Sequence, residues 1–417
     1  MSARPAARRV LVASLRYPPY VAGGYEQSCA ETVQELRARG WQVSVLCGRG
    51  DHHVPGAELF PDLEPGLDGE DPWLRVQRSG TREQWQRFMH HSGNQRATAR
   101  ALELTGAELL LYFNLGLVTP APLVAARSLG VPTLGQIFDR WPTNLWLEGW
   151  RERGNKPLRR AFFEAVWKRL RSRAEWGHLW VPSASMQAEL AAAGFAPEQL
   201  ERVPLPLPQD VRLRAEARAQ DSPTERRSGE PLRLLCTSSH WPGKGIHVAL
   251  EACRMATQAG IDLQLELLGD GSGDYPAELR QLAAPLGERV RFVGRVPRSE
   301  VFAALDRAHV LLFPSLWSEP YGLATLEALG SGVPVLASDA GASGELVRDG
   351  VDGRVLPPGD PQALAAAVVE LAADEGRRRS WARAGRERIL SGYRHADFYD
   401  RLHRTCLQHA RTPTEAR

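Results

Sequence analysis

Short apolar runs alternate along the chain with longer segments that are apolar on one face only. In the first half, runs typical of buried strands cover residues 10–15, 42–47, 109–113, 133–138 and 178–182. Residues 26–39 lie between the first two runs and place Val33, Leu36 and Ala38 on or near one face of a helix. This alternation predicts a parallel sheet covered by helices.

A second series of the same kind follows a break at residues 205–231. The break is rich in proline and charge, with few large apolar residues after Val211, which is typical of an interdomain linker. Beyond it, strand-like runs cover residues 232–237, 263–268, 290–293, 310–313 and 333–337, and helix-like segments cover residues 247–259, 276–286, 298–308 and 323–329. Residues 361–373 predict a helix capped by Asp360, and an Arg-rich helical segment covers residues 376–408.

Two α/β halves joined by a linker predict two doubly wound, Rossmann-like domains that face a cleft. In such folds, ligands bind outside the carboxyl ends of the strands. We expect the first domain at residues 1–205 and the second at residues 206–390. Residues 391–417 are expected to form a C-terminal helix that could pack back on the first domain.

Composition narrows the class of protein. The 417 residues are 43% hydrophobic and 24% charged, which argues against wholesale disorder, and the net charge of +3 is too small to indicate nucleic acid as the main partner. The first apolar run is too short for a signal peptide, and the sequence has no apolar stretch of about 18 residues that could span a membrane. Five scattered cysteines fit a reducing compartment, so we expect a cytoplasmic protein.

The most informative stretch is residues 313–346, which read FPSLWSEPYGLATLEALGSGVPVLASDAGASGEL. It predicts a strand, a loop with Glu319, and a helix that opens near Gly322 and carries Glu327. The glycine permits close backbone approach, and the N–H groups at a helix start attract phosphate. A carboxylate about one turn into that helix can accept hydrogen bonds from a ribose diol. Taken singly, either glutamate could instead be an ordinary solvated charge.

This stretch resembles the retaining glycosyltransferase family 4, whose members have the glycosyltransferase-B fold. Glu319 and Glu327, separated by seven residues, match the hallmark of the family, and segments at the start, middle and end of the chain fit in the same order. The resemblance implies that Glu327 binds the ribose of a donor nucleotide and that Glu319 holds hydroxyls of the donor sugar. It also implies donor-binding roles for Tyr321, for the amides of Gly322, Leu323 and Ala324, and, beside the base, for Gly294, Arg295 and Val296.

Lys244 is one of only three lysines and lies in a Gly-rich turn after the strand at residues 232–237. In the family, a basic pair here clamps the diphosphate leaving group, because a fixed ammonium stabilises charge that develops in the transition state. The sequence departs from the family at Ser238-Ser239, where the usual pattern is Gly-Arg. Ser239 could donate only a hydrogen bond, and His240 or an arginine from elsewhere could supply charge.

Two further candidates lie in the first half. Gly23-Gly24 separates the first strand from the first helix, and the resemblance assigns this loop to the donor phosphate and acceptor region. Residues 135–146, GQIFDRWPTNLW, carry Phe138-Asp139 where the family commonly has His-Asp. Two interpretations of Asp139 stay open: a catalytic residue that faces the acceptor, and a cap of a helix or turn.

Residues 149–176 interleave basic and aromatic side chains. Such a segment can contact an anionic membrane, although a core-facing helix with solvated arginines is the favoured interpretation. An Asp-x-Asp pair for a metal–diphosphate site does not stand out, and the family works without one. We therefore expect neither a metal nor another cofactor beyond the nucleotide-sugar co-substrate.

Together these observations predict a retaining, metal-independent glycosyltransferase. It would move a sugar from a nucleotide-diphosphate sugar, with UDP favoured, to a hydroxyl of a glycan, a lipid-linked molecule or a small molecule. The donor would bind mainly to the second domain and the acceptor to the first. Peripheral contact with the inner face of the membrane through residues 149–176 stays open as the alternative to the favoured core-facing helix. Three alternatives stay open: a sugar-nucleotide epimerase on the same fold, a non-catalytic nucleotide-sugar-binding relative, and a polymerising synthase.

Overall fold

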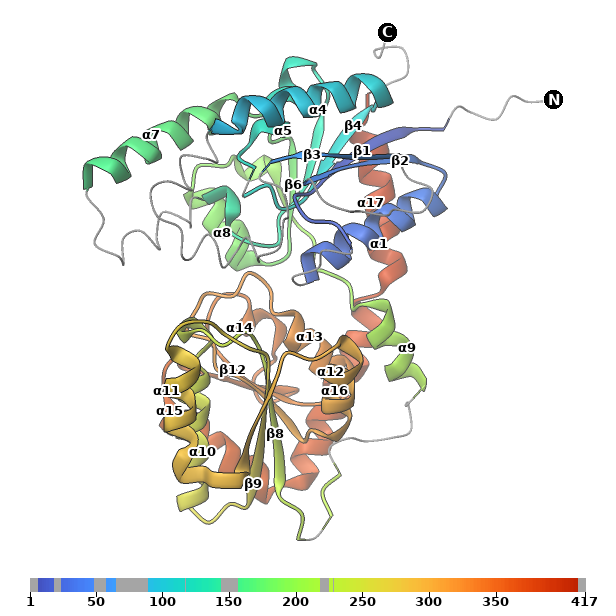
Figure 1. The fold of residues 1–417 in the computed structure, drawn as a ribbon. Helices are drawn as coiled ribbons and strands as arrows, with labels where there is room; N and C mark the ends of the chain where they lie inside the picture. The colour runs from blue at the N-terminus through green and yellow to red at the C-terminus, as the bar shows by residue number, and fades with distance from the viewer. Residues whose placement is uncertain are drawn as a thin grey trace, which may run out of the picture. The chain divides into compact units, whose positions relative to one another are not determined.

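The chain forms two compact units in the computed structural model (Figure 1). The structure describes residues 7–18, 24–48, 58–64, 89–116, 118–143, 157–217, 225–227 and 229–411. The first unit comprises Met1–Pro182, Met186–Val203 and Tyr399–Arg417, and the second comprises Ser183–Ser185 and Pro204–Phe398. The sequence predicted a boundary after residue 205 and a separate segment from residue 391.

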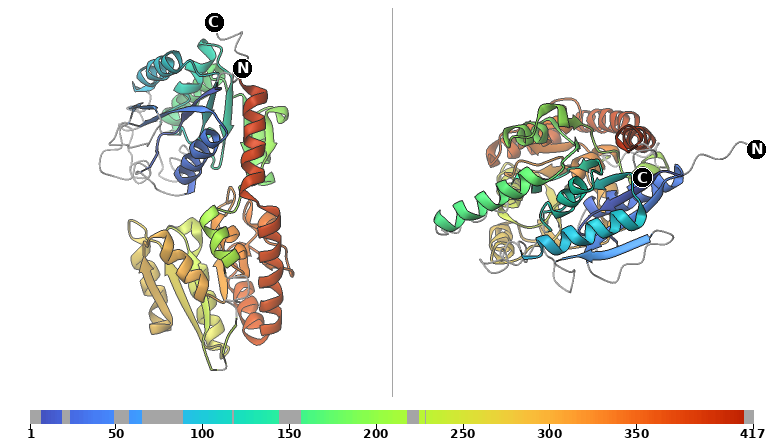
Figure 2. Two further views of the ribbon diagram at one scale, coloured as in Figure 1. Left: turned by 90° about the vertical axis from the view of Figure 1, so that its right-hand side faces the viewer. Right: turned by 90° about the horizontal axis from the view of Figure 1, so that it is seen from above.

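The first unit is built on a parallel sheet with the strand order β3-β2-β1-β4-β5-β6-β7. Its strands are β1 (Arg9–Ala13), β2 (Gln42–Gly48), β3 (Glu58–Leu63), β4 (Leu109–Tyr112), β5 (Thr133–Gln136), β6 (His178–Val181) and β7 (Leu200–Arg202). Helices cover both faces of the sheet (Figure 2). The central strands β1 and β4 are largely apolar, as in β4 with the sequence LLLY, because the middle of a parallel sheet is buried on both faces and leaves few polar positions.

The helices of the first unit follow the strands in the expected alternation. They are α1 (Gly24–Ala38), α4 (His91–Thr105), α5 (Ala121–Ser128), α7 (Pro157–Arg173) and α8 (Ala184–Ala192), with short 3₁₀ turns η1 (Trp141–Thr143) and η2 (Pro197–Gln199). The last helix is α17 (His395–His409), and its residues from Tyr399 onward belong to the first unit. Arg39 pairs with Asp400 at 2.7 Å, and the Trp41 indole donates to His403 Nδ1 at 3.0 Å. These contacts hold the C-terminal helix beside α1 and β2.

The second unit repeats the design with the parallel order β10-β9-β8-β11-β12-β13. Its strands are β8 (Leu232–Thr237), β9 (Leu263–Leu268), β10 (Val290–Gly294), β11 (Val310–Phe313), β12 (Val335–Ser338) and β13 (Gly353–Leu356). Its helices are α9 (Gln209–Ala217), α10 (Ile246–Gln258), α11 (Tyr275–Ala283), α12 (Arg298–Arg307), α13 (Leu323–Gly330), α14 (Ser343–Leu346), α15 (Pro361–Ala373) and α16 (Glu375–Gly392), with 3₁₀ turns η3 (Pro242–Lys244) and η4 (Ala284–Arg289).

The predicted fold class is therefore confirmed: the chain contains two parallel, Rossmann-like α/β sheets. The predicted cap is also present, since Asp360 accepts a hydrogen bond from the Ala363 amide at 2.9 Å at the start of α15. Among the described helices, none is both long and apolar enough to cross a membrane.

The interpretation of residues 205–231 as a plain linker was wrong in part. Residues 209–217 form α9, and its Val211 and Ala215 are buried, four residues apart on one face. Two buried positions suffice to dock this short helix, although its composition is mostly charged. The Arg-rich segment at residues 376–408 is likewise two helices, α16 and α17, separated at Tyr393 and Arg394.

The basic and aromatic segment at residues 149–176 lies only partly within the described residues, which resume at Pro157. Trp167 and Trp176 are buried, whereas Phe162 is 48% exposed. The Arg171 guanidinium lies over the Phe195 ring and donates to the Ala193 carbonyl at 2.6 Å. The two tryptophans thus belong to the core, which favours the core-facing interpretation.

Candidate active site

The loop between β11 and α13 forms the centre of the site. Gly322 has φ 100° and ψ 59°, a left-handed conformation that strongly favours glycine, and the helix begins at the next residue. The first hydrogen bond along the helix runs from the Thr325 amide to the Gly322 carbonyl at 3.0 Å. The amides of Gly322, Leu323 and Ala324 therefore stand at the helix terminus, where a helix offers its N–H groups to an anion.

Glu319 and Lys244 form an ion pair in this loop. Lys244 Nζ lies 2.7 Å from Glu319 Oε1, and the Ser315 hydroxyl donates to the same oxygen at 2.7 Å. The Glu319 side chain is only 6% exposed and that of Lys244 20%. Glu319 is therefore not a solvated charge. The structure brings together two residues that the sequence singled out separately, 75 positions apart.

Backbone contacts hold the two loops together. The amides of Leu316 and Trp317 donate to the Gly243 carbonyl at 2.8 and 2.9 Å. Gly245 has φ 65°, and a Cβ there would lie 1.9 Å from the Pro314 carbonyl oxygen, so a glycine is required for the close approach. The turn that carries Lys244 is therefore packed directly on the loop that carries Glu319.

A third loop fixes the backbone of Glu319. The Glu319 amide donates to the Ala340 carbonyl at 3.1 Å, and the Ala342 amide donates to the Glu319 carbonyl at 2.8 Å. Gly341, between these partners, has φ 65° and would place a Cβ 2.4 Å from the Glu319 carbonyl oxygen. The carboxylate thus projects from a backbone that is held on both sides.

Glu327 lies on α13 and is buried as well, with a side chain that is 10% exposed. Arg298 Nη1, from the start of α12, lies 2.9 Å from Glu327 Oε1. Burial raises the pKa of the Glu327 carboxyl, and the Arg298 guanidinium opposes this shift. Arg298 also pairs with Asp210 on α9, at 2.6 Å from Nε to Oδ2. Sequence reasoning missed Arg298 and Asp210.

The other donor-side residues take different places. Ser239 is exposed after β8, whereas His240 is buried and its amide donates to the Asp270 carbonyl at 2.6 Å. Burial lowers the pKa of His240, so the imidazole is neutral near pH 7 and is poorly suited to supply charge there. The role of Ser239 stays a prediction.

Tyr321 is buried, and its hydroxyl donates to the Leu205 carbonyl at 2.9 Å. Its side chain is therefore engaged in packing, and a donor-binding role for Tyr321 stays a prediction. Gly294 ends β10 with φ 86°, and its carbonyl accepts from the Gly269 amide at 2.8 Å. Arg295 is exposed and pairs with Asp270 at 3.3 Å, and Val296 is half-buried beside it.

In the first unit, Gly23 lies outside the described residues and Gly24 is the first residue of α1. Asp139 follows β5 and accepts hydrogen bonds from the Asn114 side-chain amide at 2.6 Å and from the Trp141 backbone amide at 3.0 Å. The second of these bonds caps η1, which is the structural interpretation. Burial, together with the nearby Glu26 carboxylate, raises the pKa of Asp139 to about 7, so a catalytic role also stays a prediction.

The raised pKa of Asp139 predicts a pH effect on stability. Because the folded-state pKa lies above the ordinary value for an aspartate, the folded state holds the proton more tightly, and stability is lost as pH rises toward and through about 7. We expect Asp139→Asn to cost stability at pH 5, where it loses one hydrogen bond, and to cost roughly 1–3 kcal/mol less at pH 8. Thermal unfolding of both proteins at the two pH values measures this difference. An equal cost at pH 5 and pH 8 would show that Asp139 titrates normally.

Within the described part of the chain, no group of three or more His, Cys, Asp and Glu side chains is arranged to hold a metal ion. The charged groups of the site are instead the Lys244–Glu319 pair and the Arg298–Glu327 pair.

Two Rossmann-like units, with a buried ammonium–carboxylate pair at a helix N-terminus in the second, define a protein of the glycosyltransferase-B class. Comparison with known families agrees: residues 23–206 match the model described as "Glycosyl transferase 4-like domain", and residues 218–388 match "Glycosyl transferases group 1". The two matches together span most of the chain, which belongs to the group 1 glycosyltransferase family.

Curated relatives match over part of their length. A phosphatidyl-myo-inositol mannosyltransferase of Mycobacterium leprae is 36% identical over 148 residues, which are 36% of this chain and 39% of that protein. The amylovoran biosynthesis glycosyltransferase AmsK of Erwinia amylovora is 36% identical over 153 residues, 35% of this chain and 37% of that protein. The matched stretch thus spans less than two-fifths of these relatives.

Solved structures agree with the whole fold. Sucrose-phosphate synthase from Thermosynechococcus elongatus superposes with a TM-score of 0.72 at 21% identity and covers 96% of this chain and 98% of that one. The Anabaena protein HepE in complex with UDP has a TM-score of 0.67 at 19% identity and covers 96% and 100%. At this level of identity the likeness establishes the fold.

Proposed function

We propose that this chain is a retaining glycosyltransferase that moves a sugar from a UDP-sugar to a hydroxyl acceptor. The observation that carries the proposal is the Lys244–Glu319 pair, which lies beside the N-terminus of α13. A cation, a set of free helix amides and a buried carboxylate in one place provide for a diphosphate and for sugar hydroxyls at once.

Each residue of the site has a separate role in the proposed reaction. The α13 amides and Lys244 Nζ hold the diphosphate, and Lys244 stabilises the extra negative charge that the diphosphate gains as the bond to the sugar breaks. Glu319 accepts hydrogen bonds from donor-sugar hydroxyls, and Glu327 accepts from the ribose diol. The acceptor oxygen forms the new bond to the anomeric carbon on the face that the diphosphate leaves, and its proton passes to the departing diphosphate. In this scheme the departing diphosphate is the base, so a side chain need not take the proton. The negative charge of the diphosphate is stabilised by Lys244 and the α13 amides.

The donor and acceptor are proposed from different observations. UDP is favoured because structural neighbours include HepE bound to UDP and to UDP-glucose, at 19–20% identity. The acceptor is a hydroxyl of a glycan, a lipid-linked molecule or a small molecule, and similar sequences include a phosphatidyl-myo-inositol mannosyltransferase and an amylovoran biosynthesis glycosyltransferase. Peripheral membrane contact through residues 149–176 stays an untested alternative to the core-facing interpretation.

The experiment that tests the proposal is a thermal-shift panel with UDP, GDP, ADP, dTDP and CDP. A ligand at 100 times its Kd adds about 2.7 kcal/mol of stability, which gives a visible shift. We expect UDP to give the largest shift and Glu327→Ala to remove it. Glu300→Ala, an exposed acidic residue in the first turn of α12, is the matched control and should leave the shift unchanged.

Product analysis then separates the alternatives. A UDP-sugar that releases UDP only with an added hydroxyl acceptor supports the transferase. Conversion of the donor to its epimer without release supports an epimerase, and binding without turnover supports a non-catalytic relative. Absence of a shift with all five nucleotides would overturn the proposal.

A further inference from the structure

Arg298 occupies an unusual place at the start of a helix. It is the first residue of α12, where the helix dipole disfavours a cation. A cation at that position therefore requires anionic partners nearby, and the structure supplies two. Glu327 Oε1 lies 2.9 Å from Nη1, and Asp210 takes Nε at 2.6 Å and Nη2 at 3.2 Å in a two-pronged contact.

The three residues come from three helices of the second unit, α9, α12 and α13. The guanidinium also lies over the Phe302 ring, 4.9 Å from its centre, so its plane is fixed by stacking as well as by hydrogen bonds. Arg298 thus has little freedom to turn away from Glu327. Because one carboxylate oxygen can accept two hydrogen bonds, the contact leaves Glu327 able to accept from a ribose diol.

We propose that Arg298 is a positioning residue for the donor nucleotide, which keeps the buried Glu327 ionised and aimed at the ribose, and that Asp210 holds Arg298 in place. The inference rests on the proposed function, since it assigns Glu327 to the ribose. It also adds a role for α9, the helix that follows the passage of the chain into the second unit. The Asp210 carboxylate of α9 holds Arg298 in place, and Arg298 in turn holds Glu327, the residue that binds the ribose.

The charged surroundings of Glu327 make this assignment specific. Helix α13 packs against α9, α14, α16, β11 and β12. On these elements, several charged side chains have partners of their own: Arg212 with Glu216, Arg214 with Asp306, Arg386 with the Ala215 carbonyl, Arg388 with Asp352, and Glu345 with backbone amides. Arg298 and Asp210 are therefore the charges that act on Glu327, as the causes of its pKa shift also indicate.

The test is the affinity for UDP, by calorimetry, of wild type, Arg298→Met and Arg298→Lys between pH 6 and pH 8.5. Methionine keeps the packing on Phe302 and removes the charge. Without that charge, the pKa of the buried Glu327 rises further, so a growing fraction of the carboxyl is protonated as pH falls. We expect Arg298→Met to bind UDP about tenfold more weakly at pH 6 and only about twofold to threefold more weakly at pH 8.5, since one pKa unit corresponds to a tenfold change.

The ratio of variant to wild-type Kd is the readout, because ionisation of the nucleotide phosphate, with a pKa near 6, is common to both proteins and cancels. Arg298→Lys should recover part of the affinity and most of the wild-type pH profile. Arg307→Met is the matched control: Arg307 ends the same helix and pairs with Glu266 at 2.8 Å, so its loss should leave UDP binding unchanged. Asp210→Asn should weaken UDP binding less than Arg298→Met.

The outcomes separate the inference from the function on which it rests. If wild type binds none of the five nucleotides of the panel, the proposed function falls and the inference falls with it. If wild type binds UDP and the Arg298→Met ratio is constant with pH, Arg298 has only a structural role and the inference alone is overturned. Thermal unfolding without nucleotide identifies a variant that fails to fold. If Arg298→Met fails to fold, Arg298→Gln, which also removes the charge but keeps a hydrogen-bond donor, takes its place in the pH series and the same two outcomes apply.

Discussion

Replacing Lys244 by methionine is expected to lower kcat by about 10²–10³ while the Kd for UDP rises by no more than about tenfold. The removal of one group that stabilises charge developing in a transition state has effects of this size. The ground-state diphosphate keeps the α13 amides, so its binding suffers less than the reaction. UDP release with saturating donor measures kcat, and calorimetry measures the Kd.

The substitution also leaves Glu319 buried without its cation. Lys244→Met/Glu319→Gln removes both charges and shows how much of the loss arises from an unpaired carboxylate. Lys168→Met, on the exposed face of α7 in the first unit, is the control for a general loss of positive charge. A Lys244→Met enzyme with wild-type kcat would remove Lys244 from the reaction, and a loss confined to the Kd would make it a binding residue only.

The pattern of the sequence predicted the two sheets because their strands are short, apolar and regularly spaced. It did not predict β3, β7 and β13. β7 has only three residues, Leu200–Arg202, and β13, Gly353–Leu356, opens with a glycine and carries an arginine. Edge strands of this kind carry little hydrophobic signal, since a neighbouring strand rather than their own composition fixes them.

In the candidate site, too, some features could be predicted from the sequence and others could not. Glu319, Glu327 and Lys244 could be singled out because each lies in a distinctive local string. That Lys244 and Glu319 touch could not be inferred, because the contact depends on Gly245 and Gly341 letting three separate loops approach. Arg298 had one usable signal, a cation at the first position of a predicted helix, and Asp210 was hidden in a segment taken for a linker.

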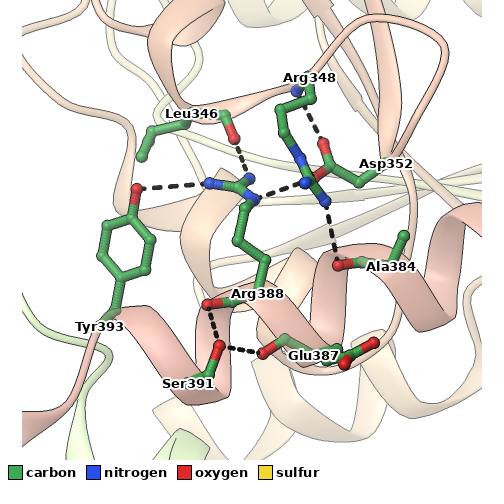
Figure 3. Close-up of polar contacts among 8 residues, drawn as sticks. All are labelled: Leu346, Arg348, Asp352, Ala384, Glu387, Arg388, Ser391 and Tyr393. Carbon is green, nitrogen blue, oxygen red and sulfur yellow. Dashed lines mark hydrogen bonds and ion pairs between the residues drawn. The ribbon is translucent and has the colours of Figure 1, made fainter.

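In the second unit, the buried carboxylate of Asp352 joins the β12–β13 connection to α16 (Figure 3). Asp352 is fully buried and lies 2.8 Å from Arg348 Nε and 3.0 Å from Arg388 Nε. It also accepts from the Arg348 amide at 2.7 Å. Arg388 donates in turn to the Leu346 carbonyl at the end of α14, the helix that follows the loop bonded to Glu319. Gly385 of α16 admits this close approach, since a Cβ there would lie 3.2 Å from that of Asp352.

We expect Asp352→Ala to destabilise the second unit by about 3–5 kcal/mol, because the removal of a fully buried carboxylate leaves the Arg388 guanidinium, which is only 20% exposed, and the Arg348 amide without their acceptor. At roughly 2–4 °C per kcal/mol for a unit of this size, the unfolding temperature should fall by about 10 °C in calorimetry of the full chain. Under the proposed function, the transition of the second unit is the one that we expect UDP to move.

Asp349→Ala, three residues away, is the matched control for Asp352→Ala. Its carboxylate is 58% exposed and pairs with Arg354 at 3.1 Å, so its loss should cost about 1 kcal/mol or less. Adding Arg388→Met to Asp352→Ala should restore part of the stability, since it removes a cation that Asp352 no longer neutralises. If Asp352→Ala unfolds at the same temperature as Asp349→Ala, water reaches the two arginines readily and the cluster contributes no more than a surface ion pair. The large expected difference follows from the burial of Asp352 and from its contact with a second arginine, Arg388, because both aspartates accept a backbone amide and pair with an arginine on the surface.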